Sequence, residues 1–295
     1  MSIGKNVEPQ PARDFVAARE RFAVLAARDG ASICAAGRSR FFEHGHATPL
    51  AIVLIHGLTN APQQWVPFAT ALTARGHNVV VPRLPGHGEA DRMTTALARV
   101  RANDYLATTN EAIDIARGAG ARVVVAGLSI GAAFAAWHAL RRSDVDRAIV
   151  LVPLFGLRRL PLAVDCALAR VLGLLPNAFV PWDPHGDGSQ IPAYGYPRFA
   201  TRALAATLRI GLAVERASHR LAPCGDIVTV LNANEPACEN TIARAIATRL
   251  ARARPERSQT IVWSDLPAIH DIVDPTNPHG RTDLVYPRLL REIER

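Results

Sequence analysis

Residues 123–131 read VVVAGLSIG, and this stretch decides the fold. Its β-branched apolar run is typical of a strand buried on both faces, and the alanines after Gly131 favour a helix. Glycines two positions before and two positions after Ser129 let the chain turn sharply between strand and helix. A serine on such a turn holds its hydroxyl clear of the sheet. Ser129 is therefore a candidate nucleophile, with Gly127 and Gly131 as the motif glycines.

A Gly-x-Ser-x-Gly pattern is short enough to occur by chance, so the rest of the chain has to support it. Apolar runs predict strands at 40–43, 51–56, 78–82, 122–127, 147–152, 227–232 and 259–263. Helical periodicity predicts helices near 62–75, 95–117, 130–141, 239–252 and 283–294. This alternation predicts an α/β fold, in which a mostly parallel central sheet carries helices on both faces.

The alternation stops over residues 154–224, where Leu, Ala, Pro and Arg dominate without a β-branched run. Roughly seventy residues are too many for an ordinary connection, so we expect two or three helices there. Because the strand pattern then resumes, this segment is predicted to be a helical cap inserted between two strands of one sheet. The predicted organisation is an N-terminal helical extension (1–39, with a helix near 12–28), an α/β core (40–153 and 225–295) and the cap insertion (154–224).

Composition limits the classes of protein to which the chain can belong. Of its 295 residues 49% are apolar, enough for a substantial core. No uninterrupted apolar run reaches about 18 residues, and the N-terminus lacks the apolar centre of a secretion signal. We therefore expect a soluble cytoplasmic protein without stable membrane insertion.

The net charge of +8 comes almost entirely from arginine, with Lys5 the only lysine. The arginines are spread along the chain, so no nucleic-acid patch is indicated, although a basic face that attracts anionic substrates or surfaces stays open. The four cysteines lie far apart, with neither a C-x-x-C pair nor a histidine at ligand spacing. We expect no metal, no cofactor and no disulfide framework. The oligomeric state cannot be read from the sequence.

A serine hydroxyl is a weak nucleophile that needs a base, and the base needs an orienting acid. On Gly-x-Ser-x-Gly turns the partners follow in the order Ser, Asp or Glu, His, each beyond a strand end. Glu235 comes three residues after the strand at 227–232. Its competitor Glu239 falls in the first turn of the next helix, where an acid has an ordinary role toward the helix dipole. We favour Glu235 as the acid.

Only two of the ten histidines follow Glu235 along the chain. His270 lies in the loop after the last strand, in the sequence SDLPAIHDIVDP, whereas His279 lies in a turn-rich NPHGR segment typical of an exposed loop. His270 is therefore the better candidate for the base.

An acyl-transfer site also needs two backbone N–H groups that stabilise the developing oxyanion. Ile130 follows the nucleophile directly and begins a helix, so its N–H is one expected donor. The second is expected from Leu58, in the loop His56-Gly57-Leu58-Thr59 after an earlier strand, with Gly57 as a further motif glycine. His56 is interpreted as a structural residue that positions this loop.

Five segments together, VLIHGLTNAPQQW, RLPGHGEA, VVVAGLSIGAA, VLNANEPA and IHDIVDP, resemble the α/β-hydrolase superfamily. The resemblance covers about residues 40–295 and is closest to bacterial carboxylesterases and monoacylglycerol-lipase-like (serine aminopeptidase-like) hydrolases. It implies the α/β-hydrolase fold, an esterase or lipase-like activity and a helical cap. It also implies Ser129 as nucleophile, His270 as base and an acid at the position of Glu235, where this chain has Glu instead of the commoner Asp.

These residues together predict a carboxylesterase-type serine hydrolase that forms an acyl-enzyme on short to medium acyl esters. Its partner is a small-molecule ester. The cap could supply an apolar acyl pocket from Leu157, Leu160, Leu162, Leu172, Leu174, Leu175, Phe179 and Trp182, although most of these are better interpreted as the cap's own core.

Other functions stay open. A peptidase or amidase of the same fold could use Asp183, Asp187 or Glu215 to recognise a charged substrate terminus. An acyltransferase would differ only in how the pocket handles water. A noncatalytic binding protein of this fold would normally lack the serine or the histidine, both of which are present here.

Overall fold

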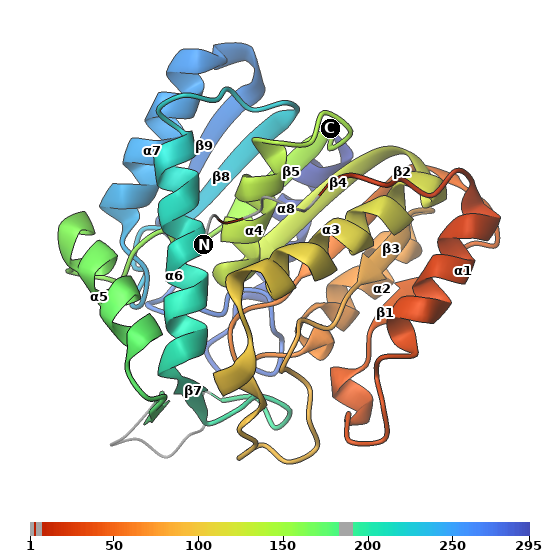
Figure 1. Cartoon of the computed structure of the whole chain (residues 1–295). Helices are drawn as coiled ribbons and strands as arrows, with labels where there is room; N and C mark the ends of the chain where they lie inside the picture. The colour runs from red at the N-terminus through yellow and green to blue at the C-terminus, as the bar shows by residue number, and fades with distance from the viewer. Residues whose placement is uncertain (1–2, 4–7, 183–190) are drawn as a thin grey trace.

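A seven-stranded sheet forms the centre of the computed structural model, which describes residues 3, 8–182 and 191–295 (Figure 1). The strand order is β1-β3-β2-β4-β5-β8-β9; β1 pairs with β3 in antiparallel fashion, and every other neighbouring pair is parallel. The strands are β1 (Arg40–Phe42), β2 (Thr48–Ile55), β3 (Asn78–Val81), β4 (Gly120–Leu128), β5 (Arg147–Leu151), β8 (Asp226–Asn232) and β9 (Ser258–Trp263). The predicted α/β fold is confirmed.

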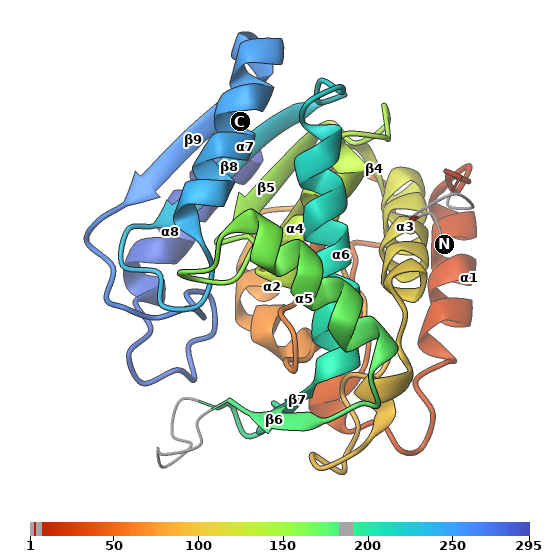
Figure 2. The same ribbon diagram turned by 60° about the vertical axis from the view of Figure 1, so that its left-hand side comes forward.

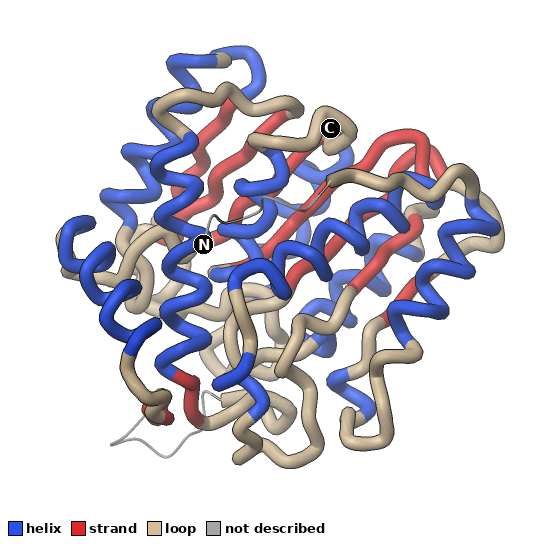
Figure 3. Tube along the Cα trace, viewed as in Figure 1, coloured by secondary structure: helices blue, strands red, loops and turns tan. Residues whose placement is uncertain are grey.

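The two faces of the sheet carry two separate hydrophobic clusters, because successive side chains of a strand point to opposite faces. In β2, Val53 and Ile55 belong to one cluster, whereas Ile52 and Leu54 belong to the other. The first face is covered by α3 (Ala102–Ala119), α4 (Ile130–Ala139) and α7 (Asn240–Ala253), and the second by α2 (Val66–Thr73) and α8 (Thr282–Glu294). Figure 3 shows the strands between these two helical layers.

Two of the expected helices are interrupted. The helix expected at 62–75 consists of a 3₁₀ turn, Pro62–Trp65, followed by α2. The helix expected at 95–117 consists of a 3₁₀ turn, Ala96–Arg99, and α3, separated by two extended residues. The second of these, Arg101, donates its backbone N–H to the Asp104 carboxylate at 2.8 Å. This hydrogen bond caps the N-terminus of α3, so a new helix begins there. The periodicity alone did not reveal these breaks.

The segment between β5 and β8 contains α5 (Leu162–Leu174), β6 (Phe179–Pro181), β7 (Arg198–Ala200) and α6 (Thr201–Ala217). The antiparallel pair β6–β7 was not expected from the sequence. α6 packs on α4 and is buried along much of its length, so it forms part of the helical layer over the sheet. α5 packs on α6 farther out, and the β6–β7 hairpin lies beyond the end of the sheet toward which β9 points (Figure 2).

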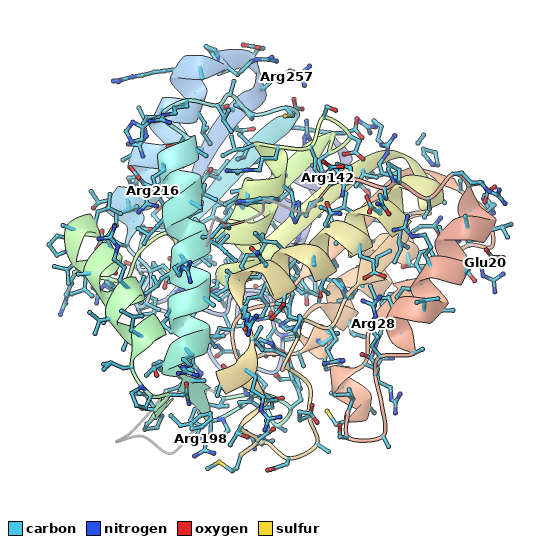
Figure 4. The ribbon with its side chains drawn as sticks, in the orientation of Figure 1. Glu20, Arg28, Arg142, Arg198, Arg216 and Arg257 are labelled. Atoms are coloured by element: carbon cyan, nitrogen blue, oxygen red, sulfur yellow. The ribbon has the colours of Figure 1, made fainter. Side chains whose placement is uncertain are left out.

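The predicted N-terminal helix is α1 (Phe15–Ala26), which begins at Asp14, whose carboxylate accepts the Ala17 N–H. α1 packs against the outer side of α3, and Arg28 just after it forms a salt bridge with Glu111 at 2.6 Å (Figure 4). Within the described ranges no helix is long and apolar enough to cross a bilayer.

Candidate active site

Ser129 occupies a strained turn between β4 and α4. Its backbone has φ 59° and ψ −112°, a conformation that L-amino acids rarely adopt. Hydrogen bonds on both sides hold it there: the Ser129 N–H donates to Leu151 O at 3.0 Å, and Ser129 O accepts the N–H groups of Ala133 and Leu154. A non-glycine residue with this geometry is retained only where its surroundings enforce it. The turn therefore has the conformation that a nucleophile elbow requires.

The motif glycines allow this turn to pack tightly. A Cβ atom on Gly127 would lie 2.2 Å from the backbone of Gly131, and one on Gly131 would lie 2.3 Å from Ile55 O on β2. No side chain fits at either position. Gly57 differs, because a Cβ there would meet only ordinary contacts, the nearest to Leu128 at 3.7 Å.

Glu235 lies on the turn after β8 with its side chain fully buried. One carboxylate oxygen, Oε1, accepts His270 Nδ1 at 2.7 Å and the N–H groups of Ala237 and Cys238 at 2.7 and 3.1 Å. Burial alone would raise the pKa of Glu235, but His270 and these hydrogen bonds hold it below its usual value. The group is therefore an anion at neutral pH, ready to orient an imidazole.

Glu239 has a different position. It caps the start of α7, where its carboxylate accepts the Thr241 N–H at 3.0 Å, and it also accepts the Arg159 N–H at 2.9 Å. Of the two acids, the geometry pairs Glu235 with His270 and leaves Glu239 in a helix-capping role.

His270 lies on the loop after β9, and its side chain is 28% exposed. Burial by itself lowers the pKa of this imidazole, but the Glu235 carboxylate outweighs burial and raises it above the usual value. Glu235 binds Nδ1, so the other ring nitrogen, Nε2, is not engaged by this carboxylate. His279, in contrast, is exposed on a turn of its own.

Cys238 lies near both Ser129 and this pair, and sequence reasoning missed it. Its side chain is buried, and the Ser129 side chain is close enough to influence the pKa of its thiol. The potential ligand atoms of Glu235, Cys238 and His270 all lie within 4.8 Å of one another. Burial and the nearby Glu235 charge raise the pKa of Cys238 well above its usual value, so the group is a neutral thiol. No motif in the sequence marks this residue, because it is brought to Ser129 by the turn that carries Glu235.

The side chains of His56 and Gln64 hold the loop after β2. His56 accepts the Leu84 N–H at Nε2 and donates from Nδ1 to Gly57 O at 2.9 Å, and burial lowers its pKa well below the usual value. It is thus a neutral structural residue. The Gly57 N–H donates to Gln64 Oε1 at 2.9 Å, which fixes the backbone just before Leu58.

Gln64 links this loop to the residue after His270. Its Nε2 donates to Asp271 Oδ2 at 2.6 Å, and Asn60 Nδ2 donates to the same oxygen at 2.9 Å. Burial and the neighbouring Asp274 charge raise the pKa of Asp271. The Asp271 carboxylate therefore joins the loop that contains Leu58 to the loop that contains His270. Asn60 and Asp271 are 211 positions apart, so no local sequence pattern predicts their contact.

The inserted segment covers the Leu58 loop. Trp182 Nε1 donates to Thr59 Oγ1 at 2.6 Å, and the Tyr196 N–H donates to Thr59 O at 2.8 Å. Tyr194 hydrogen-bonds to Asp274. Residues beside β6 and β7 thus contact both the loop after β2, at Thr59, and the loop after β9, at Asp274.

A family model that matches residues 52–293 decides the classification: it describes the α/β hydrolase family. The chain belongs to this family. A thermostable monoacylglycerol lipase from Bacillus sp. (strain H-257) is 29% identical over 97 residues, which are 33% of this chain and 38% of that protein. The match thus spans well under half the length of that relative.

Solved structures are similar to this α/β hydrolase over most of its length. The monoacylglycerol lipase of Paleococcus ferrophilus superposes with a TM-score of 0.66 at 15% identity, covering 86% of this chain and 97% of that one. A soluble variant of monoglyceride lipase from Saccharomyces cerevisiae, in complex with a substrate analogue, gives a TM-score of 0.65 at 11% identity, covering 87% and 91%. At these identities the likeness shows the shared fold.

Of the acids considered for recognition of a charged substrate terminus, only Glu215 lies within the described ranges of this α/β hydrolase. Glu215 on α6 is largely buried and contacts Arg249 of α7 at 3.2 Å and His219 at 2.9 Å. Asp183 and Asp187 lie outside the described residues. None of the eight apolar insertion residues is fully buried, and Leu174 is 83% exposed.

Proposed function

We propose that this α/β hydrolase is a carboxylic ester hydrolase with Ser129 as nucleophile, His270 as general base and Glu235 as the orienting acid. The observation that carries the proposal is the 2.7 Å bond between Glu235 Oε1 and His270 Nδ1, together with the strained serine turn at the end of β4. These three groups come from three strand ends in the order that acyl transfer on this fold requires.

In the proposed reaction, Ser129 Oγ attacks the ester carbonyl carbon while its proton passes to His270 Nε2. The imidazolium is stabilised by Glu235, which is anionic at neutral pH. Collapse of the tetrahedral intermediate breaks the bond to the alcohol, which leaves with the proton from His270. Water then attacks the acyl-enzyme by the same route and releases the carboxylic acid.

We assign the oxyanion hole to the backbone N–H groups of Leu58 and Ile130. Ile130 is the first residue of α4, so its N–H has no partner within the helix and lies at the positive end of the helix dipole. The assignment of the Leu58 N–H is supported by the preceding residue, Gly57. The backbone of Gly57 is held by a hydrogen bond to Gln64, which in turn binds Asp271. Neither donor depends on a metal or an organic cofactor.

For the substrate, we propose short to medium acyl esters, with monoacylglycerols as the first class to test because lipases of that class are among the relatives. The proposed cap consists of α5 and the β6–β7 hairpin, whose contacts with Thr59 place it beside the oxyanion loop. α6, although inserted in the same segment, is a core helix by its packing on α4. We propose a cytoplasmic location.

A fluorophosphonate probe tests the proposal directly. The adduct is expected on Ser129, mapped by peptide mass spectrometry, and p-nitrophenyl esters of increasing chain length are expected to be hydrolysed with a preference for short to medium acyl groups. Labelling at another residue, or unchanged ester turnover in Ser129→Ala, would refute the mechanism.

A further inference from the structure

Cys238 takes no part in the proposed ester hydrolysis, although it lies beside Glu235 and His270. We propose that Cys238 Sγ, the Glu235 carboxylate and a ring nitrogen of His270 form a binding site for a borderline or soft divalent cation such as Zn²⁺ or Cd²⁺. Binding of the ion is independent of the proposed function. Its consequence, reversible inhibition of the hydrolase, rests on that function.

The spacing of the donor atoms suits such an ion. The three ligand atoms already lie within 4.8 Å of one another. Bond lengths of about 2.3 Å to sulfur and about 2.0–2.1 Å to nitrogen or oxygen put neighbouring donors of a tetrahedral ion roughly 3.5 Å apart. Side-chain adjustments of about 1 Å would therefore close the site around a metal.

Glu235 supplies an independent indication of a ligand. Its Oε1 is used by His270 and two backbone N–H groups, but its Oε2 is buried without a hydrogen-bond partner among the described residues. A carboxylate oxygen deprived of both water and a donor is costly. A cation held between Glu235, Cys238 and His270 would satisfy it.

The donor set also determines which ion fits. Thiolate and imidazole select Zn²⁺ and softer metals, whereas Mg²⁺ and Ca²⁺ prefer six or more oxygen ligands and would find one carboxylate here. Access is possible from the side of His270, whose side chain is 28% exposed. Binding displaces the thiol proton of Cys238 to solvent and forms a metal–sulfur bond.

Metal binding at this site stops the proposed reaction whichever ring nitrogen is used. An ion on His270 Nε2 occupies the lone pair that accepts the Ser129 proton. An ion on Nδ1 replaces the bond to Glu235 and removes the orientation of the ring. In both cases Cys238 Sγ, next to the Ser129 hydroxyl, becomes a metal ligand.

The binding test uses the purified, chelator-treated full chain titrated with Cd²⁺, with the ultraviolet cadmium–thiolate band as readout and calorimetry for Zn²⁺. One equivalent is expected to bind. Cys238→Ala is expected to lose the band and to weaken binding at least roughly tenfold. Cys166→Ala, which removes a half-buried thiol on α5, serves as the matched control and is expected to bind like the parent protein.

Two outcomes would overturn the site: no stoichiometric binding to the parent protein, or an unchanged band in Cys238→Ala. Circular dichroism checks that Cys238→Ala is folded, and Cys238→Val provides a second variant of different size. His270→Gln, with Cys238 retained, is expected to weaken binding as well, since it removes the nitrogen ligand. Unchanged Zn²⁺ affinity in His270→Gln would refute the three-ligand site.

The activity test separates this inference from the proposed function. Each variant is compared with its own metal-free rate on p-nitrophenyl butyrate. Zn²⁺ is expected to inhibit the parent and Cys166→Ala, chelator to restore them, Mg²⁺ to have no effect, and Cys238→Ala to resist. Ester turnover that Zn²⁺ leaves unchanged would refute the inhibition and leave the proposed function intact. Cd²⁺ binding without any ester turnover would support the site and refute the proposed function.

Discussion

The ends of the core strands and the outer part of the insertion are built in different ways. Ser129 is surrounded by buried strands, and every described loop around it is tied by hydrogen bonds to another loop. α5, in contrast, exposes Val164, Val171 and Leu174 to solvent and packs mainly on α6. The difference indicates that the proposed chemistry depends on the core, whereas α5, the outermost part of the insertion, can vary with little effect on it.

The largest effect is expected from Ser129→Ala. Loss of the proposed nucleophile should lower kcat for ester hydrolysis by about 10⁴- to 10⁶-fold, because the proposed general base then has no hydroxyl to activate. Leu174→Ser, at the most exposed apolar position of α5, is the comparison in the insertion and should stay within about twofold of the parent, as expected for a surface site. Initial rates on p-nitrophenyl esters measure both. A large loss in Leu174→Ser would break the contrast.

Glu235→Gln should lower kcat by about 10³- to 10⁴-fold, since a neutral amide cannot stabilise the imidazolium. The pH profile carries a second signature. His270 acts as a base only when neutral, so activity falls as the pH drops through its pKa, which Glu235 raises. In Glu235→Gln that acid limb should move to lower pH.

Glu239→Gln is the matched control for the acid. It should keep the pH profile of kcat/KM and the rate of the parent, because Glu239 caps α7 and does not touch His270. A shifted acid limb in Glu239→Gln, with an unchanged one in Glu235→Gln, would reverse the assignment.

A Gly→Ala substitution can be made in each of the two regions and its effect on stability compared. Gly131→Ala should lower the free energy of unfolding by about 3 kcal/mol or more, because its Cβ would lie 2.3 Å from Ile55 O. Gly173→Ala on α5 meets nothing within 4 Å and should raise it by about 0.5 kcal/mol through helix propensity. Urea unfolding measures both values. Equal effects at the two positions would show that the core turn is more adaptable than its contacts indicate.

The smallest loss of turnover among the site variants is expected from Gln64→Ala. This substitution removes the side-chain amide that hydrogen-bonds to both the Gly57 N–H and Asp271. kcat should fall by about tenfold with little change in KM, because in the proposed mechanism the Leu58 N–H stabilises the oxyanion of the transition state more than the carbonyl of the bound substrate. Gln63→Ala, at the half-buried neighbouring position of the same turn, is the control. A purely structural role for Gln64 would lower the melting temperature and leave kcat unchanged.

The sequence predicted the parts of the molecule that depend on local pattern. β4 is recognisable because its three consecutive valines, Val123–Val125, suit a strand that packs against a hydrophobic cluster on each face of the sheet. The helix after Ser129 follows from its alanines. The mostly parallel sheet follows from the alternation of strands and helices, whereas the order of the strands was not predicted. The order of Ser129, Glu235 and His270 was also available from strand ends.

The parts that escaped prediction depend on contacts between distant residues. Cys238 meets Ser129 only after β8 and β4 enter the same sheet, and Asp271 meets Gln64 across most of the chain. The break before α3 depends on one side chain, Asp104, which closes on the Arg101 N–H. The β6–β7 pair forms between short segments with no apolar alternation to mark them.

The positive φ of Ser129 has a consequence for how this chain can change. A glycine would adopt that backbone conformation at lower cost, by about 1–3 kcal/mol for a relieved outlier. A sequence selected for thermal stability alone would therefore drift toward glycine at position 129. Retention of serine there opposes that drift, and attempts to stabilise the protein by consensus or directed selection need to screen for turnover as well as for folding.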